Sequence, residues 1–100
     1  MNIKQNKEGT KLTVYIDGRI DTTTSPMLYE HLQQELVGVN ELVLDFSKVE
    51  YVSSAGLRVL LFAQKTMNSV QGKMTVCHVN DDIMETFELT CFTDIINIEK

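Results

Sequence analysis

The sequence contains no apolar run approaching the ~20 residues that a membrane-spanning helix requires, and no charged-then-apolar export leader opens it. It has only one proline and five glycines among 100 residues, and 43% of its residues are hydrophobic. These proportions exclude a collagen-like fibre and a disordered tail. A chain of this length can bury roughly 60–70% of its extended surface. We therefore expect one cytoplasmic domain that spans residues 1–100.

Basic residues are also scarce. Nine Lys and Arg against 14 Asp and Glu give a formal net charge of -5. Nonspecific nucleic-acid binding depends on Lys and Arg that neutralise phosphates, and attraction to an anionic membrane surface needs positive charge as well. The composition therefore argues against a nucleic acid or a membrane surface as the partner.

Cysteine and histidine are too few and too scattered to indicate a disulfide framework or a metal site. Cys77 and Cys91 form no CxxC pair, so we expect reduced, buried thiols. His31 and His78 have no ligand neighbour at helical or zinc-finger spacing. His31 lies in a polar helical stretch and is expected to be solvated, whereas His78 alternates with Val76 along a predicted strand and is expected to pack.

What the sequence does contain is periodic. Leu12, Val14 and Ile16 alternate with polar residues, which predicts a half-buried strand. Ile3–Gln5 precede this strand across the turn-rich segment Asn6–Gly9, and the two together predict a β-hairpin.

Helices and further strands follow. Ser25 and Pro26 predict an N-cap followed by proline at the first helical position, in a helix that ends near Gly38. The apolar run Leu42–Phe46 predicts a strand buried on both faces, as in parallel sheets. The remaining predicted elements are a helix from about Ser54 to Val70, a strand from Met74 to Val79, a short helix capped by Asp81, and a last strand or edge at Ile95–Ile98.

The resulting order is β-β-α-β-α-β-α-β, and it predicts an α/β fold. Strands that alternate with helices favour a mainly parallel sheet of about five strands, with the first hairpin strand at an edge and helices packed against the sheet.

The segment from Asp45 to Leu61 is the most informative about function. The strand is expected to end at Asp45, and a loop then brings Ser53 and Ser54 to a helix start, where Ser54 can act as the N-cap. Ligands and modifications gather at such strand ends and helix N-termini in α/β sheets. Gly56 is a poor helix former and is expected to allow close backbone packing or to leave room beside the serine.

The helix that follows is more apolar than one buried face requires. Between Leu57 and Ala63 only Arg58 is polar, and consecutive helical residues point about 100° apart. Either the helix is sandwiched within the domain, or part of its apolar surface is exposed to a partner, with Arg58 as an exposed contact beside it.

These residues resemble the STAS domain family, and within it the small free-standing anti-sigma factor antagonists of bacteria. Gly18-Arg19-Ile20-Asp21 is similar to the family's Gly-x-Ile/Leu-Asp element, and the strand from Leu42 to Ser47 to its Asp-x-Ser strand end. Tyr51–Leu57 is similar to its phosphorylation loop, and Gly72-Lys73-Met74 to the glycine before its fourth strand. The resemblance covers essentially the whole chain.

The resemblance implies a switch rather than an enzyme. By motif position Ser54 is the phosphorylated residue, with Ser53 as the alternative; family members often carry an acidic residue where this chain has Ser53. The implied partner is an anti-sigma factor that is also a serine kinase of the histidine-kinase-like ATPase type, and a serine phosphatase is a further implied partner. The unphosphorylated antagonist binds the anti-sigma factor and frees the sigma factor. The implied partner-binding residues are Asp21, Asp45, Ser53, Ser54, Gly56, Leu57 and Arg58, with Asp21 and Asp45 bordering the site. No cofactor and no catalytic residue are implied.

Three other interpretations stay open at this point. An enzyme is disfavoured because the chain has no Gly-x-Ser-x-Gly elbow and no histidine in a partnering loop. A nucleotide-binding module lacks both glycine-rich fingerprints, although the helix start at Ser54 could bind phosphate weakly. A STAS subunit of a stress-signalling assembly or of a lipid or anion transport complex would share the fold and serve another circuit.

Overall fold

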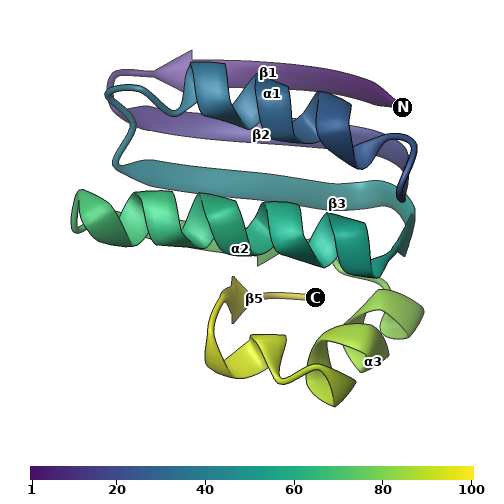
Figure 1. Cartoon of the computed structure of the whole chain (residues 1–100). Coiled ribbons are helices and arrows are strands. Elements are labelled where there is room, and N and C mark those ends of the chain that lie inside the picture. The colour runs from purple at the N-terminus through teal and green to yellow at the C-terminus, as the bar shows by residue number, and fades with distance from the viewer.

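Five strands form one mixed sheet in the order β1-β2-β3-β4-β5 (Figure 1). The computed structural model describes residues 1–100. Its strands are β1 (Asn2–Glu8), β2 (Lys11–Ile20), β3 (Glu41–Val52), β4 (Lys73–Cys77) and β5 (Asn97–Ile98), and its helices are α1 (Ser25–Glu35), α2 (Ser54–Ser69) and α3 (Asp81–Leu89), followed by a 3-10 turn at Phe92–Asp94. β1 and β2 form an antiparallel hairpin at one edge, and all other pairs are parallel. The predicted order and sheet type are confirmed.

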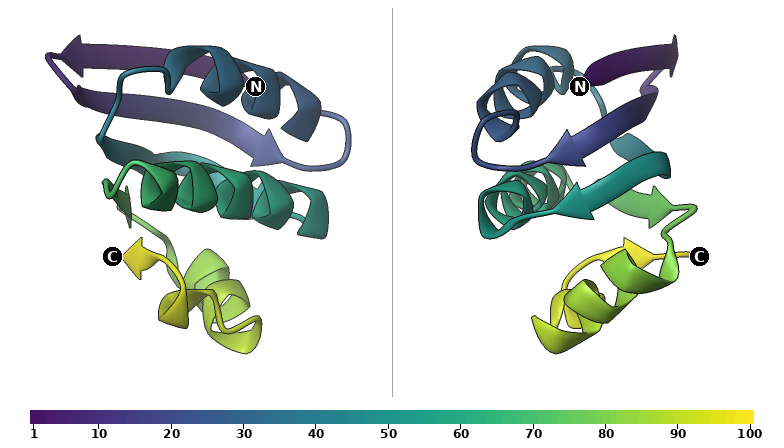
Figure 2. Two further views of the ribbon diagram at one scale, coloured as in Figure 1. Left: turned by 60° about the vertical axis from the view of Figure 1, so that its left-hand side comes forward. Right: turned by 90° about the vertical axis from the view of Figure 1, so that its right-hand side faces the viewer.

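Only one face of the sheet is covered by α1 and α2, which lie on the same side of the strands (Figure 2). Leu42, Leu44 and Phe46 of β3 are buried, but Val43 and Asp45 between them are only half-buried. The expectation that this strand is buried on both faces is therefore wrong. Each parallel strand is added next to the previous one in the same direction, and right-handed crossovers then bring successive helices to the same face.

The hydrophobic core lies between the covered face and the helices. It comprises 23 buried residues, including Leu28 and Leu32 of α1, Leu60 and Met67 of α2, and Phe87 of α3. Burial of these side chains is the main source of stability for the sheet and the helices on it, because apolar burial contributes about 25 cal/mol per Å². None of the three helices is both long enough and apolar enough to span a bilayer.

β3 is longer than the sequence indicates. It continues past Asp45 to Val52 and stays paired with β2, with Asp17 opposite Lys48 and Ile20 opposite Val52. Two register shifts interrupt this pairing. The polar Ser47 and Lys48, which suggested a loop, are therefore strand residues whose side chains are exposed.

Several predicted ends differ by one to three residues. Ser25 is the first residue of α1 rather than its cap; Thr24 holds the N-cap position without a side-chain cap bond, and the helix ends at Glu35. Asn80 rather than Asp81 caps α3, since its Oδ1 accepts a hydrogen bond from the Ile83 N–H at 2.8 Å.

The cysteines and histidines also depart from expectation. Cys91 is exposed and Cys77 is half-buried, so the prediction of two buried thiols is wrong. β4 ends at Cys77, and His78 follows it as an exposed residue with a positive φ of 58° rather than a packed strand residue. His31 is half-buried on α1 and its Nε2 lies 2.8 Å from the Gln5 side-chain oxygen.

Candidate functional site

The junction between β3 and α2 is set by Ser53. Its backbone is still extended (φ -88°, ψ 176°), and its N–H donates to the Ile20 carbonyl oxygen at 2.8 Å as the last link to β2. Its Oγ accepts a hydrogen bond from the Gly56 N–H at 3.3 Å, and its carbonyl accepts the first helical bond, from the Leu57 N–H. Ser53 is therefore the N-cap of α2, and the prediction that Ser54 caps the helix is wrong.

Ser54 is the first residue of α2 and is exposed to solvent. Because Ser53 supplies the capping oxygen, the Ser54 hydroxyl is free of that role. The first N–H groups of a helix have no intrahelical partner, and the helix dipole favours negative charge there. A hydroxyl in this position can receive a phosphoryl group without disturbing the hydrogen bonds that start the helix.

Gly56 brings the first turn of α2 into direct contact with the strand ends. A Cβ at this position would lie 2.7 Å from the Ile20 Cγ2, 2.9 Å from the Val52 Cγ1 and 3.0 Å from the Ile20 carbonyl oxygen. Close backbone packing, one of the two roles expected of this glycine, is what the structure shows. Leu57, the next residue, is half-buried against the core.

Asp21 lies directly after Ile20, the residue whose carbonyl holds Ser53. Its carboxylate Oδ1 accepts hydrogen bonds from the backbone N–H groups of Thr23 and Thr24, both at 3.0 Å. The Thr24 N–H is the main cause of an Asp21 pKa below the ordinary value of 3.8, although desolvation opposes it. The Arg19 side chain, 3.7 Å from Oδ2, favours the charged form as well. The Asp21 carboxylate therefore fixes the turn before α1. The hydrogen bond between Ile20 and Ser53 keeps this turn next to the start of α2.

The apolar side chains of α2 fall into two groups, one in the core and one partly exposed beside α1. Val59 and Leu60 are buried in the core, whereas Phe62 is half-buried and its ring packs against Tyr29 of α1 with centroids 4.6 Å apart. Arg58 is exposed and lines a groove of about 400 Å³ between α1 and α2. Helical residues four apart are neighbours on the helix surface, so Arg58 lies on the same side of α2 as Ser54.

The electrostatic character of α2 itself is positive. It contains no acidic residue, and Arg58 and Lys65 are both exposed on it.

Asp45, which was expected to border the site, precedes Ser53 by eight residues on the extended β3. At about 3.3 Å per residue, that separation is roughly 26 Å along the strand. The structure therefore brings Asp21, Ser53, Ser54, Gly56 and Leu57 together and leaves Asp45 apart.

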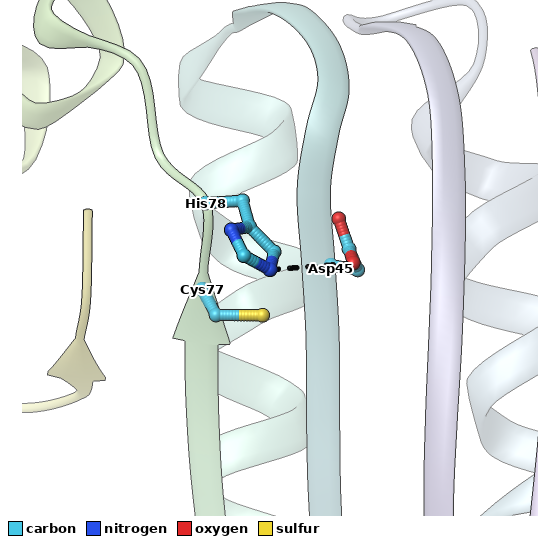
Figure 3. Close-up of side chains that lie close together, drawn as sticks. All are labelled: Asp45, Cys77 and His78. Carbon is cyan, nitrogen blue, oxygen red and sulfur yellow. Dashed lines mark ion pairs between the residues drawn. The ribbon is translucent and has the colours of Figure 1, made fainter.

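Asp45 instead belongs to a cluster that sequence analysis missed. Its carboxylate, the Cys77 thiol and the His78 ring have ligand atoms that all lie within 4.8 Å of one another (Figure 3). Burial raises the pKa of the Cys77 thiol, and the negative charges of Asp45 and Glu99 raise it further. The adjacent Cys-His pair was the available signal, but only strand pairing shows that an aspartate lies beside it.

Comparison with known proteins identifies relatives along the full chain. The family model of the STAS domain matches residues 2–100. The anti-sigma-B factor antagonist of Listeria monocytogenes is 30% identical over 106 residues, a match that covers 100% of this chain and 91% of the relative. The Bordetella bronchiseptica protein BtrV is 29% identical over 99 residues, covering 98% of this chain and 85% of its own length.

Solved structures agree on the fold. A Thermotoga maritima protein superposes with a TM-score of 0.92 at 18% identity, covering 98% of this chain and 86% of its own. The antagonist SpoIIAA superposes with TM-scores of 0.78 in its unphosphorylated form and 0.77 in its phosphorylated form, at 10% identity and over 99% of this chain. The matches cover 87% and 92% of those two chains.

Proposed function

We propose that this chain, which belongs to the STAS domain family, is an anti-sigma factor antagonist that is switched by phosphorylation of Ser54. In the unphosphorylated state it binds an anti-sigma factor and so releases a sigma factor. The observation that carries this proposal is that two adjacent serines have different structural roles at the start of α2. Ser53 caps the helix, whereas the Ser54 hydroxyl is exposed. The named relatives support the assignment.

Ser54 is the better phosphoacceptor for a structural reason. Ser53 is half-buried and its Oγ accepts a hydrogen bond from the Gly56 N–H, so a phosphoryl group there would disturb the cap. Loss of such a cap costs about 0.5–2 kcal/mol of helix stability. The hydroxyl of Ser54 has no capping role, and modification there leaves the cap intact.

A phosphate on Ser54 would change the surface rather than the fold. It would carry about -1.5 to -2 charges at pH 7 and would be stabilised by the N-terminal end of the helix dipole. Arg58, four residues further on, is within the range of a helical ion pair with it. The phosphate would therefore both add bulk and engage Arg58, and each effect removes a contact that a docking partner needs.

We define the proposed docking surface as Asp21, Ser53, Ser54, Gly56, Leu57 and Arg58. Gly56 itself is buried, so it contributes to this surface only through the exposed residues next to it. The partner that fits is an anti-sigma factor which is also a serine kinase of the histidine-kinase-like ATPase type, since one protein can then recognise the hydroxyl and modify it. A serine phosphatase resets the switch. The exchange takes place in the cytoplasm, where sigma factors act, and the chain acts by binding rather than by catalysis.

The proposal is tested by incubating the protein with the cognate kinase and ATP, followed by mass-spectrometric mapping of the phosphate. Phosphate is expected on Ser54 in the wild type and in the Ser53→Ala control, and on neither serine in Ser54→Ala. Calorimetry should show that Ser54→Ala binds the anti-sigma factor about as well as the wild type, whereas Ser54→Asp binds several-fold more weakly. Both variants should keep the wild-type melting temperature within a few degrees.

Two results would contradict the proposal. One is phosphate on Ser53 alone. The other is equal affinity of the alanine and aspartate variants for the anti-sigma factor. Affinity purification from the source bacterium adds an independent check, because recovery of membrane transport subunits in place of a histidine-kinase-like ATPase would assign the chain to a transport complex.

A further inference from the structure

We propose that Asp45, Cys77 and His78 form a binding site for one Zn²⁺ ion on the helix-free face of the sheet. This site lies apart from the docking surface at the start of α2, and it is independent of the proposed phosphorylation switch.

Strand pairing brings two of the three ligands together. Asp45 of β3 is directly opposite Cys77 of β4 in the parallel register. Side chains opposite each other in a sheet point to the same face. Leu44 and Val76, their preceding neighbours, are buried under the helices, so Asp45 and Cys77 both point to the face that carries no helix. Their positions are held by the sheet and do not depend on a loop.

The backbone of His78 supplies the third ligand. Successive residues of a strand point to opposite faces, so an extended His78 would point away from Cys77. Instead His78 has a φ of 58°, a left-handed conformation that is uncommon for a non-glycine residue. This turn directs the imidazole toward Asp45, with Nε2 3.9 Å from Oδ2 (Figure 3).

The distances are close to those of a zinc site. Metal–ligand bonds of about 2.0–2.3 Å in a tetrahedron separate the ligand atoms by roughly 3.3–3.6 Å. The His78–Asp45 pair exceeds that range by less than an ångström, and all three ligand atoms lie within 4.8 Å of one another. The imidazole can close this gap by rotation, because 61% of the His78 side chain is exposed.

The chemistry of the donors selects the metal. One thiolate, one imidazole and one carboxylate form a mixed soft and hard set of the kind that Zn²⁺ accepts, whereas Mg²⁺ and Ca²⁺ require oxygen ligands. Asp45 and Glu99 provide negative charge around the thiol, and a bound cation would offset that charge and hold the sulfur as the thiolate. Three protein ligands leave the fourth position for water on the solvent side.

The site is tested by calorimetric titration of the full chain with ZnCl₂, after treatment with a chelator and under a phosphine reductant. One zinc per chain is expected, together with a rise in melting temperature. Titration with Co²⁺ should give the visible bands of tetrahedral cobalt and a sulfur-to-cobalt charge-transfer band. The cobalt spectrum identifies the thiolate ligand directly.

The variants keep the backbone intact. Cys77→Ala should abolish the charge-transfer band, and His78→Asn, which tolerates a left-handed φ, should weaken zinc binding at least tenfold. The matched controls are Cys91→Ala and His31→Ala, which remove the other thiol and the other imidazole and should leave binding unchanged. The proposal is overturned if zinc does not bind, if Cys77→Ala and His78→Asn bind it like the wild type, or if one zinc is shared by two chains.

Discussion

Replacing Gly56 with alanine adds one methyl group where the first turn of α2 packs most closely on the ends of β2 and β3. The new Cβ would lie 2.7 Å and 2.9 Å from methyl carbons of Ile20 and Val52 and 3.0 Å from the Ile20 carbonyl oxygen. Ile20 and Val52 are both buried, so their side chains have little room to rotate away. The carbonyl cannot retreat freely either, because it accepts the Ser53 N–H at 2.8 Å.

Two opposing terms set the size of the effect. Overpacking a buried position typically costs about 1–3 kcal/mol. Alanine is also a better helix former than glycine, by up to about 1 kcal/mol in a helix interior. Because three contacts are too short at once, the packing term should exceed the propensity term, and we expect Gly56→Ala to destabilise the domain by about 1–2 kcal/mol. Each kcal/mol corresponds to a fall of about 4–8 °C in melting temperature for a domain of this size.

The assay is urea denaturation followed by circular dichroism, supported by thermal melts. Ala55→Gly, one residue earlier in the same turn, is the matched control, because Ala55 is only half-buried and its substitution reports the propensity term alone. Both variants should have a lower free energy of unfolding than the wild type. This result would show that alanine is the more stabilising residue at position 55 and glycine at position 56. A Gly56→Ala protein as stable as the wild type, or more stable, would refute the argument from close packing.

Three further predictions test other parts of the structure. Ser53→Ala should cost about 0.5–2 kcal/mol in urea denaturation because it removes the α2 cap, whereas Ser54→Ala should cost much less. Asp21→Asn should lower stability at neutral pH; since hydrogen bonds hold the Asp21 pKa below 3.8, its contribution is complete above that value and is lost as the pH falls through the lower folded pKa. The difference between this variant and the wild type in melts across the pH range should therefore shrink in acid, and a constant difference would contradict the assignment. Leu60→Ala should cost about 2–5 kcal/mol as a fully buried core truncation, and a smaller loss for the half-buried Phe62→Ala would separate core from surface on α2.

The element order could be predicted because its signals are local. Alternation in β2, the turn-rich Asn6–Gly9 and the Ser25-Pro26 signal at the start of α1 each depend on residues close together in the sequence. Caps were predicted one residue late at all three helices, since each start has two adjacent residues able to cap, such as Ser53 and Ser54. Residue preference cannot choose between two such neighbours. The choice depends on where the strand stops, and Ser53 is still bonded to the carbonyl of Ile20.

The two proposed sites of this chain differ in how far apart their residues lie in the sequence. The proposed phosphorylation loop is contiguous, so its residues are neighbours in any α/β fold that starts a helix at Ser54. The Asp45 cluster depends on a register between β3 and β4 and on one left-handed dihedral angle at His78, neither of which is visible in a periodic pattern. The strand was expected to end at Asp45, and the family resemblance implied that this carboxylate borders the serine site. Once β3 is extended to Val52, Asp45 moves to the helix-free face, where its neighbours are a thiol and an imidazole. A metal ion would connect β3 and β4 at the point where β4 ends. His78→Asn removes both a zinc ligand and the His78–Asp45 ion pair, so the result that distinguishes the two is a rise in melting temperature on addition of zinc that Cys77→Ala abolishes.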